Sequence, residues 1–564
     1  MIDKRGTGIL TLAADSTSFT GTTTVNAGTL AVNGSLGGTL DVLSGARLQG
    51  AGTVGTTTVA TSGTIAPGNS IGTLTVDGDL ILAAGSRFEI EVNPEGIDSD
   101  LVKVRGTATL DGGTVAHIGA NGNYDIRSTY TILSAGVLNG AFEGVTSDFA
   151  FLTPNLIYDF AAGTVDLELA RNNRDFAAAA LTRNQIATAN GIESIGFDGG
   201  HDVYDAIAQL ADDEDLIRAS FDALSGEIHA SAKSALIENS HFIRDAVYDR
   251  LGAVFEGAGA QAVPVLAYDE GGPVLAFATT DRFAAWGTAF GSWGSIDGDG
   301  NAASLDTSTG GLLTGIDGLV AENVRLGILT GYSHISFDAD SRTSSGSSNN
   351  YHLGLYGGTQ RGALAVRSGL AYTWHDIETS RSVVMPGFAD SLSSDYNAGT
   401  FQAFGELGYS IDTPAASFEP FFNLAYVNLH TDGFTEKGDA AALTSHGETT
   451  DTTFTTLGLR GSAGFVLGTV KATARGMLGW RCLHSRRRTD RERCRPYQYR
   501  PRFQSDRCRN PRYRLSGSVR LRRPAERLQR KTRGEVLSIK RERFGECISS
   551  ARCQHIGDIQ PGHP

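Results

Sequence analysis

The pentapeptide Gly68-Asn69-Ser70-Ile71-Gly72 has the spacing G-x-S-x-G, which in many hydrolases places a nucleophilic serine on a sharp turn. That arrangement requires a helix directly after the serine. Here the next residues, Thr73-Leu74-Thr75-Val76, alternate polar β-branched and apolar side chains and predict a strand. The motif therefore predicts a tight turn between strands, without a nucleophile.

Two other groups of residues have the chemistry of metal ligands. Asp297-Gly298-Asp299-Gly300-Asn301 resembles the start of a calcium loop, but position six is Ala302 and position twelve is Ser308, where a glycine and a bidentate Glu are needed. His229 and His241 lie far apart on one predicted helix, with no cysteine nearby, and indicate a polar helix face. We therefore expect no catalytic residue, no metal site and no cofactor, and we expect that the chain is not an enzyme.

The remaining candidate residues are charges on strands whose pattern repeats every two residues. From Arg282 onward apolar side chains alternate with polar or small ones, as Val324 and Leu326 do with Arg325. Either a lipid-facing barrel with a polar lumen or a soluble sandwich gives this alternation, and the aromatic residues at strand ends favour the barrel. The charges that we expect to face the lumen are Arg325, Arg367, Glu406, Arg460, Lys471 and Arg475.

Acidic residues on a long amphipathic segment, Glu227 to Leu251, offer partners for these charges. Opposite charges in a narrow pore are poorly screened and attract one another strongly. Two alternatives remain open, namely hydration of the lumen charges by water or pairing with the helix. The acids that would take part in pairing are Glu227, Glu238, Asp245 and Asp249.

The elements that would carry these residues change along the chain. Gly-Thr-apolar triplets recur in the first segment, each with glycine at a corner and an apolar side chain pointing inward. They begin at Gly28, Gly38, Gly52, Gly63 and Gly72. Rungs of this kind bury their apolar side by stacking on one another, which predicts a right-handed parallel β-helix.

Four domains follow from these patterns, and the fold class is mainly β. We expect a β-helical region at 1–170, an α-helical linker at 171–272, an antiparallel transmembrane β-barrel at 273–480 and a basic tail at 481–564. About nine barrel strands can be recognised, starting near residues 283, 311, 324, 350, 363, 400, 417, 453 and 469. Single-chain bacterial barrels have an even number of strands, so this barrel is expected to be incomplete.

The tail differs in composition from everything before it. Residues 481–564 carry 24 Lys+Arg and 8 Asp+Glu, whereas residues 1–480 carry 24 and 54, and all five cysteines fall in the tail. A frame-shifted translation explains the joint rise of Arg and Cys best. The alternatives are a basic arm for nucleic acid and a metal site, but no Cys-x-x-Cys pair supports the metal site. We expect a disordered tail that binds no nucleic acid.

Three segments in order resemble the autotransporters of type V secretion. Ile65 to Leu74 is similar to a motif near the end of their β-helical passengers, and Leu224-Ser225-Gly226-Glu227 with Arg244 to Leu251 is similar to the stretch that leads into their translocator. Gly310-Gly311-Leu312-Leu313-Thr314-Gly315 resembles an opening barrel strand. The final strands and terminal aromatic residue of the family are replaced by the tail, and no signal peptide follows Met1.

This resemblance implies a protein of the bacterial outer membrane that exports its own passenger and displays it on a Gram-negative cell. It implies a helix threaded through the barrel, contact with outer-membrane lipid, and assembly by the barrel-assembly and periplasmic chaperone machinery. The passenger would be an adhesin or virulence-type protein with a ligand on a host or cell surface. Two alternatives are an anchor for a secreted enzyme whose catalytic part lies upstream, and a simple outer-membrane channel.

Overall fold

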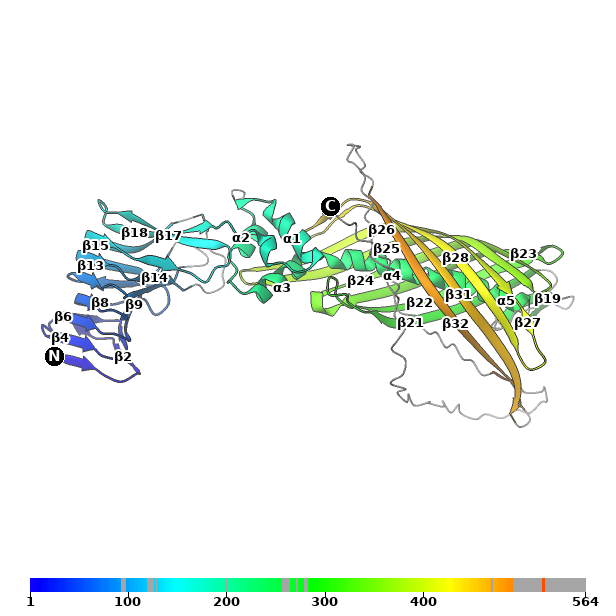
Figure 1. The fold of residues 1–564 in the computed structure, drawn as a ribbon, viewed down its shortest axis with the longest axis horizontal. Coiled ribbons are helices and arrows are strands. Elements are labelled where there is room, and N and C mark those ends of the chain that lie inside the picture. The colour runs from blue at the N-terminus through cyan, green and yellow to red at the C-terminus, as the bar shows by residue number, and fades with distance from the viewer. Residues whose placement is uncertain are drawn as a thin grey trace, which may run out of the picture.

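The computed structural model describes residues 1–92, 98–118, 126–127, 129–197, 200–255, 264–269, 272–277, 283–467, 470–489 and 520–522. Within these ranges it describes the side chains of all residues except 264–277, 465–475, 483–489 and 520–522. Three parts follow one another along the chain, as Figure 1 shows: a β-helix, a group of short helices, and a large antiparallel sheet.

The β-helix is built from two parallel sheets, between which the chain alternates. One sheet contains β1 (Ile2–Lys4), β4 (Thr22–Val25), β6 (Ser35–Val42), β8 (Thr53–Val59), β10 (Thr73–Val76), β13 (Leu101–Asp111) and β15 (Thr129–Ala141). The other contains β2 (Ile9–Leu12), β5 (Gly28–Val32), β7 (Ala46–Gly50), β9 (Thr64–Pro67), β12 (Arg87–Ile90), β14 (Thr114–His117) and β16 (Gly144–Thr146). The short strands β3 (Asp15–Ser16) and β11 (Leu80–Leu82) pair at the side of the first sheet.

The core of the β-helix consists of the apolar residues of the predicted triplets. Leu30, Leu40, Val54, Ile65 and Leu74 are all buried between the two sheets. The neighbouring polar residues lie on the outer surface or at its edge, so each strand has one apolar and one wet face. The predicted β-helix is confirmed.

Glycines at one corner of the rungs allow the backbones to approach closely. Gly38 has a φ of +79°, and a Cβ atom there would lie 2.0 Å from the carbonyl oxygen of Gly21 in the rung below. A Cβ on Gly55 would lie 1.9 Å from the carbonyl oxygen of Gly38. No side chain fits at these corners, which explains the high glycine content.

A change of strand direction ends the stack. β18 (Thr164–Arg171) pairs antiparallel with β15, and β17 (Leu152–Asp159) pairs antiparallel with β18. Phe151 and Phe176 meet edge to face below this cap, with ring centroids 4.8 Å apart. The cap covers the apolar end of the β-helix before the helices begin.

Helices connect the cap to the antiparallel sheet. They are the 3₁₀ helix η1 (Phe176–Ala179) and the α-helices α1 (Arg183–Glu193), α2 (Asp202–Ala208), α3 (Glu214–Leu224), α4 (Glu227–Asn239) and α5 (His241–Val254). Thr182 and Gln185 form a capping box that starts α1. The predicted single stretch from Glu227 to Leu251 is divided at Ser240, the last residue before α5. Across the described residues, no helix is long and apolar enough to cross a membrane.

The antiparallel sheet, here called the barrel sheet, contains nine strands of 14 to 22 residues. They are β21 (Phe283–Ile296), β22 (Leu305–Ala321), β23 (Val324–Ala339), β24 (Ser344–Arg361), β25 (Leu364–Met385), β26 (Phe388–Tyr409), β28 (Ser417–Thr431), β31 (Glu448–Leu467) and β32 (Val470–Thr489). Each pairs with its sequence neighbour in this series. Short pieces flank them: η3 (Asp340–Arg342), β27 (Ile411–Asp412), β29 (Phe434–Thr435) and β30 (Thr444–Ser445).

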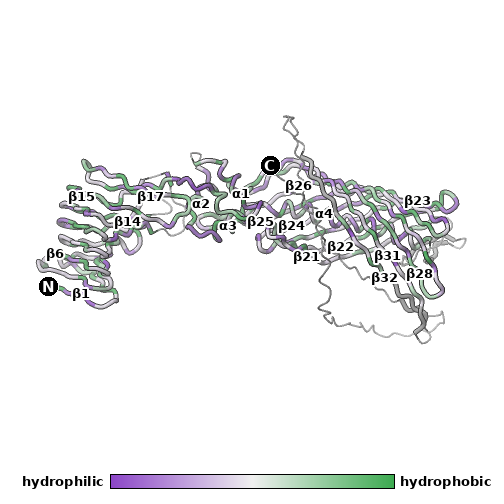
Figure 2. Tube along the Cα trace, in the orientation of Figure 1, coloured by the Kyte–Doolittle hydropathy of each residue, from purple (hydrophilic) through white to green (hydrophobic). Residues whose placement is uncertain are grey.

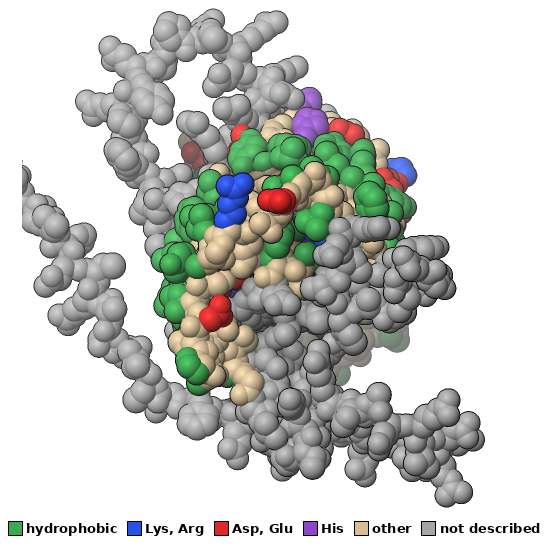
Figure 3. All heavy atoms as spheres, turned by 90° about the vertical axis from the view of Figure 1, so that its right-hand side faces the viewer, with side chains coloured by type: hydrophobic (Ala, Val, Ile, Leu, Met, Phe, Trp, Pro, Cys, Tyr) green, Lys and Arg blue, Asp and Glu red, His purple; other side chains and the backbone are tan. Residues whose placement is uncertain are grey.

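The two faces of the barrel sheet differ in polarity, and the apolar face is the exposed one. Leu326, Leu355, Leu370, Trp374 and Leu424 are each about half exposed, whereas polar and charged residues on the same strands are buried. Hydrophobic side chains accordingly gather on the outer rim in Figure 3, and hydropathy alternates along the strands in Figure 2. A sandwich would bury the apolar face, so the structure supports the lipid-facing barrel.

The barrel sheet is open. Among the described strands, β21 and β32 do not pair with each other; β21 pairs with β19 (Pro264–Asp269), which pairs with β20 (Gly272–Phe277), and β32 pairs with β33 (Arg520–Arg522). The incomplete antiparallel barrel predicted from the sequence is confirmed. β32 itself continues beyond Trp480, where the alternating pattern ended, and pairs with β31 as far as Thr489.

The two ends of the barrel sheet have different connections. Short turns, such as Glu322–Asn323 and Gly362–Ala363, join the strands at the end far from the β-helix, which we call the short-turn end. At the opposite end the hairpin of β25 and β26 reaches the helices. Its residues Val383, Met385 and Leu392 belong to the same apolar core as α2, α3 and the β-helix cap.

Candidate functional site

Helices α4 and α5 lie against the polar inner face of the barrel sheet and form its occupied interior. Their residues Ile228, Leu236, Val247 and Leu251 pack with inward residues of the sheet such as Phe404. The chain thereby passes from the β-helix end to the short-turn end inside the sheet and returns as β21. This interior is the candidate functional site.

Asp317 of β22 is the centre of a buried charge cluster near the short-turn end. Arg250 of α5 donates to it from Nε and Nη2 at 2.8 and 2.9 Å, and Arg325 of β23 donates to the same carboxylate. The hydroxyl of Tyr356 donates at 2.7 Å, and the indole N–H of Trp286 donates to that hydroxyl at 2.5 Å. One carboxylate on the sheet thus binds the end of α5 directly.

A second buried cluster lies on β25, β26, β28 and β31. Arg367 donates 2.7 Å bonds to Glu406 and Glu419, and Arg460 donates 2.7 and 2.9 Å bonds to the same two carboxylates. The guanidinium of Arg460 also lies 4.0 Å above the ring of Phe421. Two arginines and two glutamates therefore neutralise each other in an interior from which lipid and bulk water are excluded.

Polar contacts from the helices continue along the interior. Arg244 of α5 donates to the side-chain oxygen of Gln402 at 2.8 Å and to Ser240 at 3.0 Å. The ring of Tyr248 meets that of Phe404 edge to face, with centroids 5.6 Å apart. Helix α5 therefore has specific side-chain partners in the sheet. A helix separated from the sheet by water would not make such contacts.

The β-helix end of the interior is closed by a third cluster. Glu436, in the connection between β28 and β31, accepts bonds of 2.8 and 2.7 Å from Arg381 of β25. His229 of α4 lies 2.8 Å from the same carboxylate and 4.3 Å, between ring centroids, from Phe434. His229 was expected on a polar helix face, but it is buried because the sheet surrounds α4.

Four of the six predicted lumen charges, Arg325, Arg367, Glu406 and Arg460, lie on this inner face, and each has an ion-pair partner. The side chains of Lys471 and Arg475 lie outside the described residues. The charges of the predicted set mostly bind one another or other acids of the sheet, because carboxylates on adjacent strands are closer than the helix is.

The helix acids have other partners than those proposed. Glu227 pairs with Arg342 at 3.2 Å, Glu238 pairs with Arg481 at 3.2 Å, and Asp245 lies 3.7 Å from His241. Asp249 does act electrostatically on one predicted residue, Arg460. The helix contributes a cation to the sheet instead, since Arg250 pairs with Asp317. Sequence reasoning missed Arg250, Asp317 and Glu419. Asp317 and Glu419 could have been found, because each stands at a position of its strand whose side chain points inward.

The two sequence motifs with potential chemistry have structural roles. Ser70 precedes β10, so a strand stands where the nucleophile elbow needs a helix. In the Asp297–Asn301 loop, Asp299 accepts bonds from backbone N–H groups, and Asn301 exchanges amide hydrogen bonds of 2.8 to 3.1 Å with Asn184 of α1. This loop holds the helices against the barrel sheet. No group of metal-ligating side chains occurs among the described residues.

Two titratable residues of the β-helix have unusual environments. Burial raises the pKa of Asp100 to about 7, although the backbone N–H groups of Glu91 and Gly72 donate to it at 2.9 and 2.8 Å. Burial lowers the pKa of His117 to about 4, while Ser147 lies 3.0 Å from its Nδ1. An imidazole of such low basicity is a weak general base at neutral pH, so His117 and Ser147 do not make an effective nucleophile pair.

Comparison with known proteins places these features in context. Residues 285–492 match the family described as "Autotransporter beta-domain", and residues 2–32 match "Passenger-associated-transport-repeat". Two solved structures are also similar: the beta domain of the Bordetella autotransporter Brka (20% identity, TM-score 0.31, 36% of this chain, 80% of that chain) and the translocator domain of autotransporter NalP from Neisseria meningitidis (14%, 0.28, 45% and 92%). The resemblance indicated by the sequence motifs is confirmed.

Curated relatives correct one expectation. Two proteins of Serratia marcescens named "Extracellular serine protease" are 34% and 30% identical over 530 and 531 residues, each match covering 85% of this chain and 48% of the relative. The chain therefore spans about half the length of the relatives that it matches. These names contradict the prediction that the chain is not an enzyme, which rested on motifs in a chain that spans only half of such a relative.

Proposed function

We propose that the barrel sheet exports the β-helix and then holds it at the surface of the outer membrane. The premise is that this chain carries an autotransporter β-domain. The observation that carries this proposal is the path of α4 and α5 along the polar interior of a sheet with an apolar exterior. If the β-helix has been exported through the barrel, the segment that follows it must run through the barrel interior to the first strand. Helices α4 and α5 follow this path.

The direction of transport would come from folding. Rungs of the β-helix bury apolar residues only after they stack, so rungs formed outside cannot return through the barrel as an extended chain. The charged interior lets a polar backbone pass without contact with lipid, and the final position is fixed when Arg250 reaches Asp317. Partners on this route would be outer-membrane lipid, periplasmic chaperones and the barrel-assembly machinery.

Export is tested by expressing the chain behind a signal sequence in a Gram-negative host. Added protease should degrade the β-helix on intact cells while a periplasmic marker survives. Deletion of residues 283–489 should leave the β-helix protected in the periplasm. Protection of the β-helix in cells that carry the intact chain would contradict the proposal.

We further propose that the exported cargo is proteolytic, in place of the adhesin that the sequence alone favoured. The support is the name shared by the two relatives. The one motif in this chain with the spacing of a nucleophile elbow, at Ser70, precedes a strand, so the nucleophile is assigned to the half of the relatives that this chain does not span.

A fluorophosphonate probe, which labels activated serines, tests this assignment. A chain extended to the length of the relatives should be labelled, and residues 1–564 alone should not. Labelling of residues 1–564 alone would overturn the location of the nucleophile, and an unlabelled extended chain would overturn the proteolytic role.

A further inference from the structure

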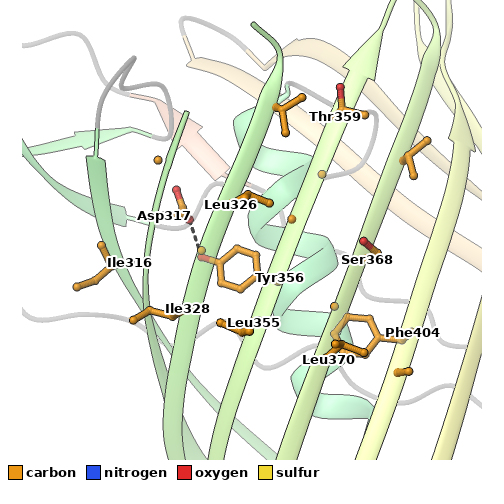
Figure 4. A pocket seen from close by; sticks show the side chains of 18 of the residues that line it. Ile316, Asp317, Leu326, Ile328, Leu355, Tyr356, Thr359, Ser368, Leu370 and Phe404 are labelled. Atoms are coloured by element: carbon orange, nitrogen blue, oxygen red, sulfur yellow. Dashed lines mark hydrogen bonds between the residues drawn. The ribbon is translucent and has the colours of Figure 1, made fainter. Parts of the chain in front are cut away.

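The outer face of the barrel sheet has a groove of ≈ 870 Å³ that extends over β21 to β26, shown in Figure 4. Its floor contains two small residues in register on adjacent strands, because Gly357 of β24 pairs with Ser368 of β25. Ser368 is exposed, so the floor is open at β25, while Leu326 covers Gly357 at the other side.

Bulky residues form walls on both sides of that floor. Leu355 pairs with Leu370 in one wall, and Val366 pairs with Thr359 in the other. The side chains of Leu355, Leu370 and Val366 are exposed by 40% to 60%, so these walls belong to the apolar outer surface of the sheet. The cross-section between the two walls suits a single hydrocarbon chain.

The wall nearer the short-turn end has polar groups. The hydroxyl of Thr359, in that wall, is buried and has no hydrogen-bond partner in the structure. Arg361 follows two residues later on the same outward face, is exposed, and ends β24 at the turn. An apolar groove followed by a hydroxyl and then a guanidinium matches the order of acyl chain, ester and phosphate in a phospholipid.

The position along the strands identifies the leaflet. Arg361 and Thr359 lie at the short-turn end, and the β-helix lies beyond the opposite end. If the β-helix is outside the cell, the short turns face the periplasm, and the groove opens to the inner leaflet.

We propose that this groove binds one anionic phospholipid of the inner leaflet, with an acyl chain between the two walls and the phosphate on Arg361. The inference rests on the proposed function, since it requires insertion in the outer membrane. A second copy of the chain is a poorer occupant, because a flat partner strand would leave the recessed floor at Ser368 unfilled.

The test is native mass spectrometry of the full chain, folded in micelles doped with phosphatidylglycerol. One lipid should remain bound per chain. Ser368→Leu fills the floor and should weaken retention at least tenfold, and Arg361→Gln should weaken it about fivefold, the effect of one cation near an anionic surface. Gly310→Leu, on an outward glycine with open space at the other end of β22, is the matched control and should retain the lipid.

Two further probes separate the sources of binding. Inorganic phosphate alone should not displace the lipid, whereas lysophosphatidylglycerol should, because it carries both chain and phosphate. Equal retention by the wild type and Ser368→Leu, or a dimer that forms in place of lipid binding, would overturn the proposal. A chain that shows no heat-modifiable folded form in micelles would count against the proposed function; a folded chain without bound lipid would count against the groove alone.

Discussion

The β-helix and the barrel sheet use the same alternation of apolar and polar residues with opposite results. In the β-helix Leu74 is buried and its polar neighbours meet water, whereas in the barrel sheet Leu355 is exposed and its neighbour Tyr356 is buried. Alternation therefore shows that a strand has two different environments, but it does not show which of them lies inside.

The difference has an energetic consequence. The β-helix interior is filled mostly by apolar side chains, which need no specific partners, so its rungs tolerate variable spacing. The barrel interior contains ionised groups, and each must be neutralised by a specific neighbour, as Arg367 is by Glu406 and Glu419. In the β-helix, substitutions should therefore be tolerated when they keep an apolar side chain inside. In the barrel interior, a charged residue should be replaceable only together with its partner.

The largest effect should follow from removing the central carboxylate of the barrel interior. Asp317→Ala leaves the guanidiniums of Arg250 and Arg325 buried without the charge that neutralises them, and should lower the free energy of unfolding by about 3–5 kcal/mol. Urea unfolding of the full chain in bilayers measures this. Asp306→Ala, an exposed acid on the same strand, should change stability by less than about 0.5 kcal/mol. Equal losses of stability in the two variants would contradict the central role of Asp317 in the barrel interior.

A matched pair of leucines compares the two regions directly. Leu74→Ala opens a cavity in the β-helix and should destabilise it by about 2–5 kcal/mol, while Leu355→Ala on the lipid face should cost less than about 1 kcal/mol. Hydrogen exchange of β10 and β24 amides in the reconstituted chain reports both. A larger loss at Leu355 would mean that its face is packed against protein.

Glycine corners should show a smaller effect. Gly38→Ala and Gly45→Ala both place a side chain at positive φ, but only Gly38 has a backbone oxygen 2.0 Å from the new atom. We expect Gly38→Ala to destabilise the β-helix by about 1–3 kcal/mol more than Gly45→Ala, because of this overlap. Thermal unfolding followed by protease resistance of the β-helix distinguishes the two, and equal losses would exclude close rung contact.

The smallest expected effect, counted per pH unit, is that of the ionisation of Asp100 on the stability of the β-helix. Its folded pKa of about 7 lies above the ordinary 3.8, so folding favours the protonated acid. That stability is present below pH 3.8 and is lost as the pH rises towards 7, with a slope of about 1.4 kcal/mol per pH unit at most. His117, with a lowered pKa, acts in the opposite direction. The difference between the wild type and Asp100→Asn in amide exchange near β12 isolates Asp100, and a difference independent of pH would contradict the assignment.

The spacing of apolar residues along the sequence predicts the positions of the strands well, because it depends only on residues close together in the chain. The triplet at Gly63 and the strand at Val324 both lie where expected. Pairing across the barrel interior could not be predicted, since Arg250 meets Asp317 only after a helix and two strands are placed in three dimensions. Activity could not be predicted either, because this chain corresponds to only about half the length of its relatives.

The shared core of the β25–β26 hairpin, α2, α3 and the β-helix cap has a mechanical consequence. Tension applied to the β-helix would reach the barrel sheet through Val383, Met385 and Leu392 as well as through the backbone of α4. The load is then shared in parallel, so α4 and α5 are not the first elements to be drawn out when the β-helix is pulled.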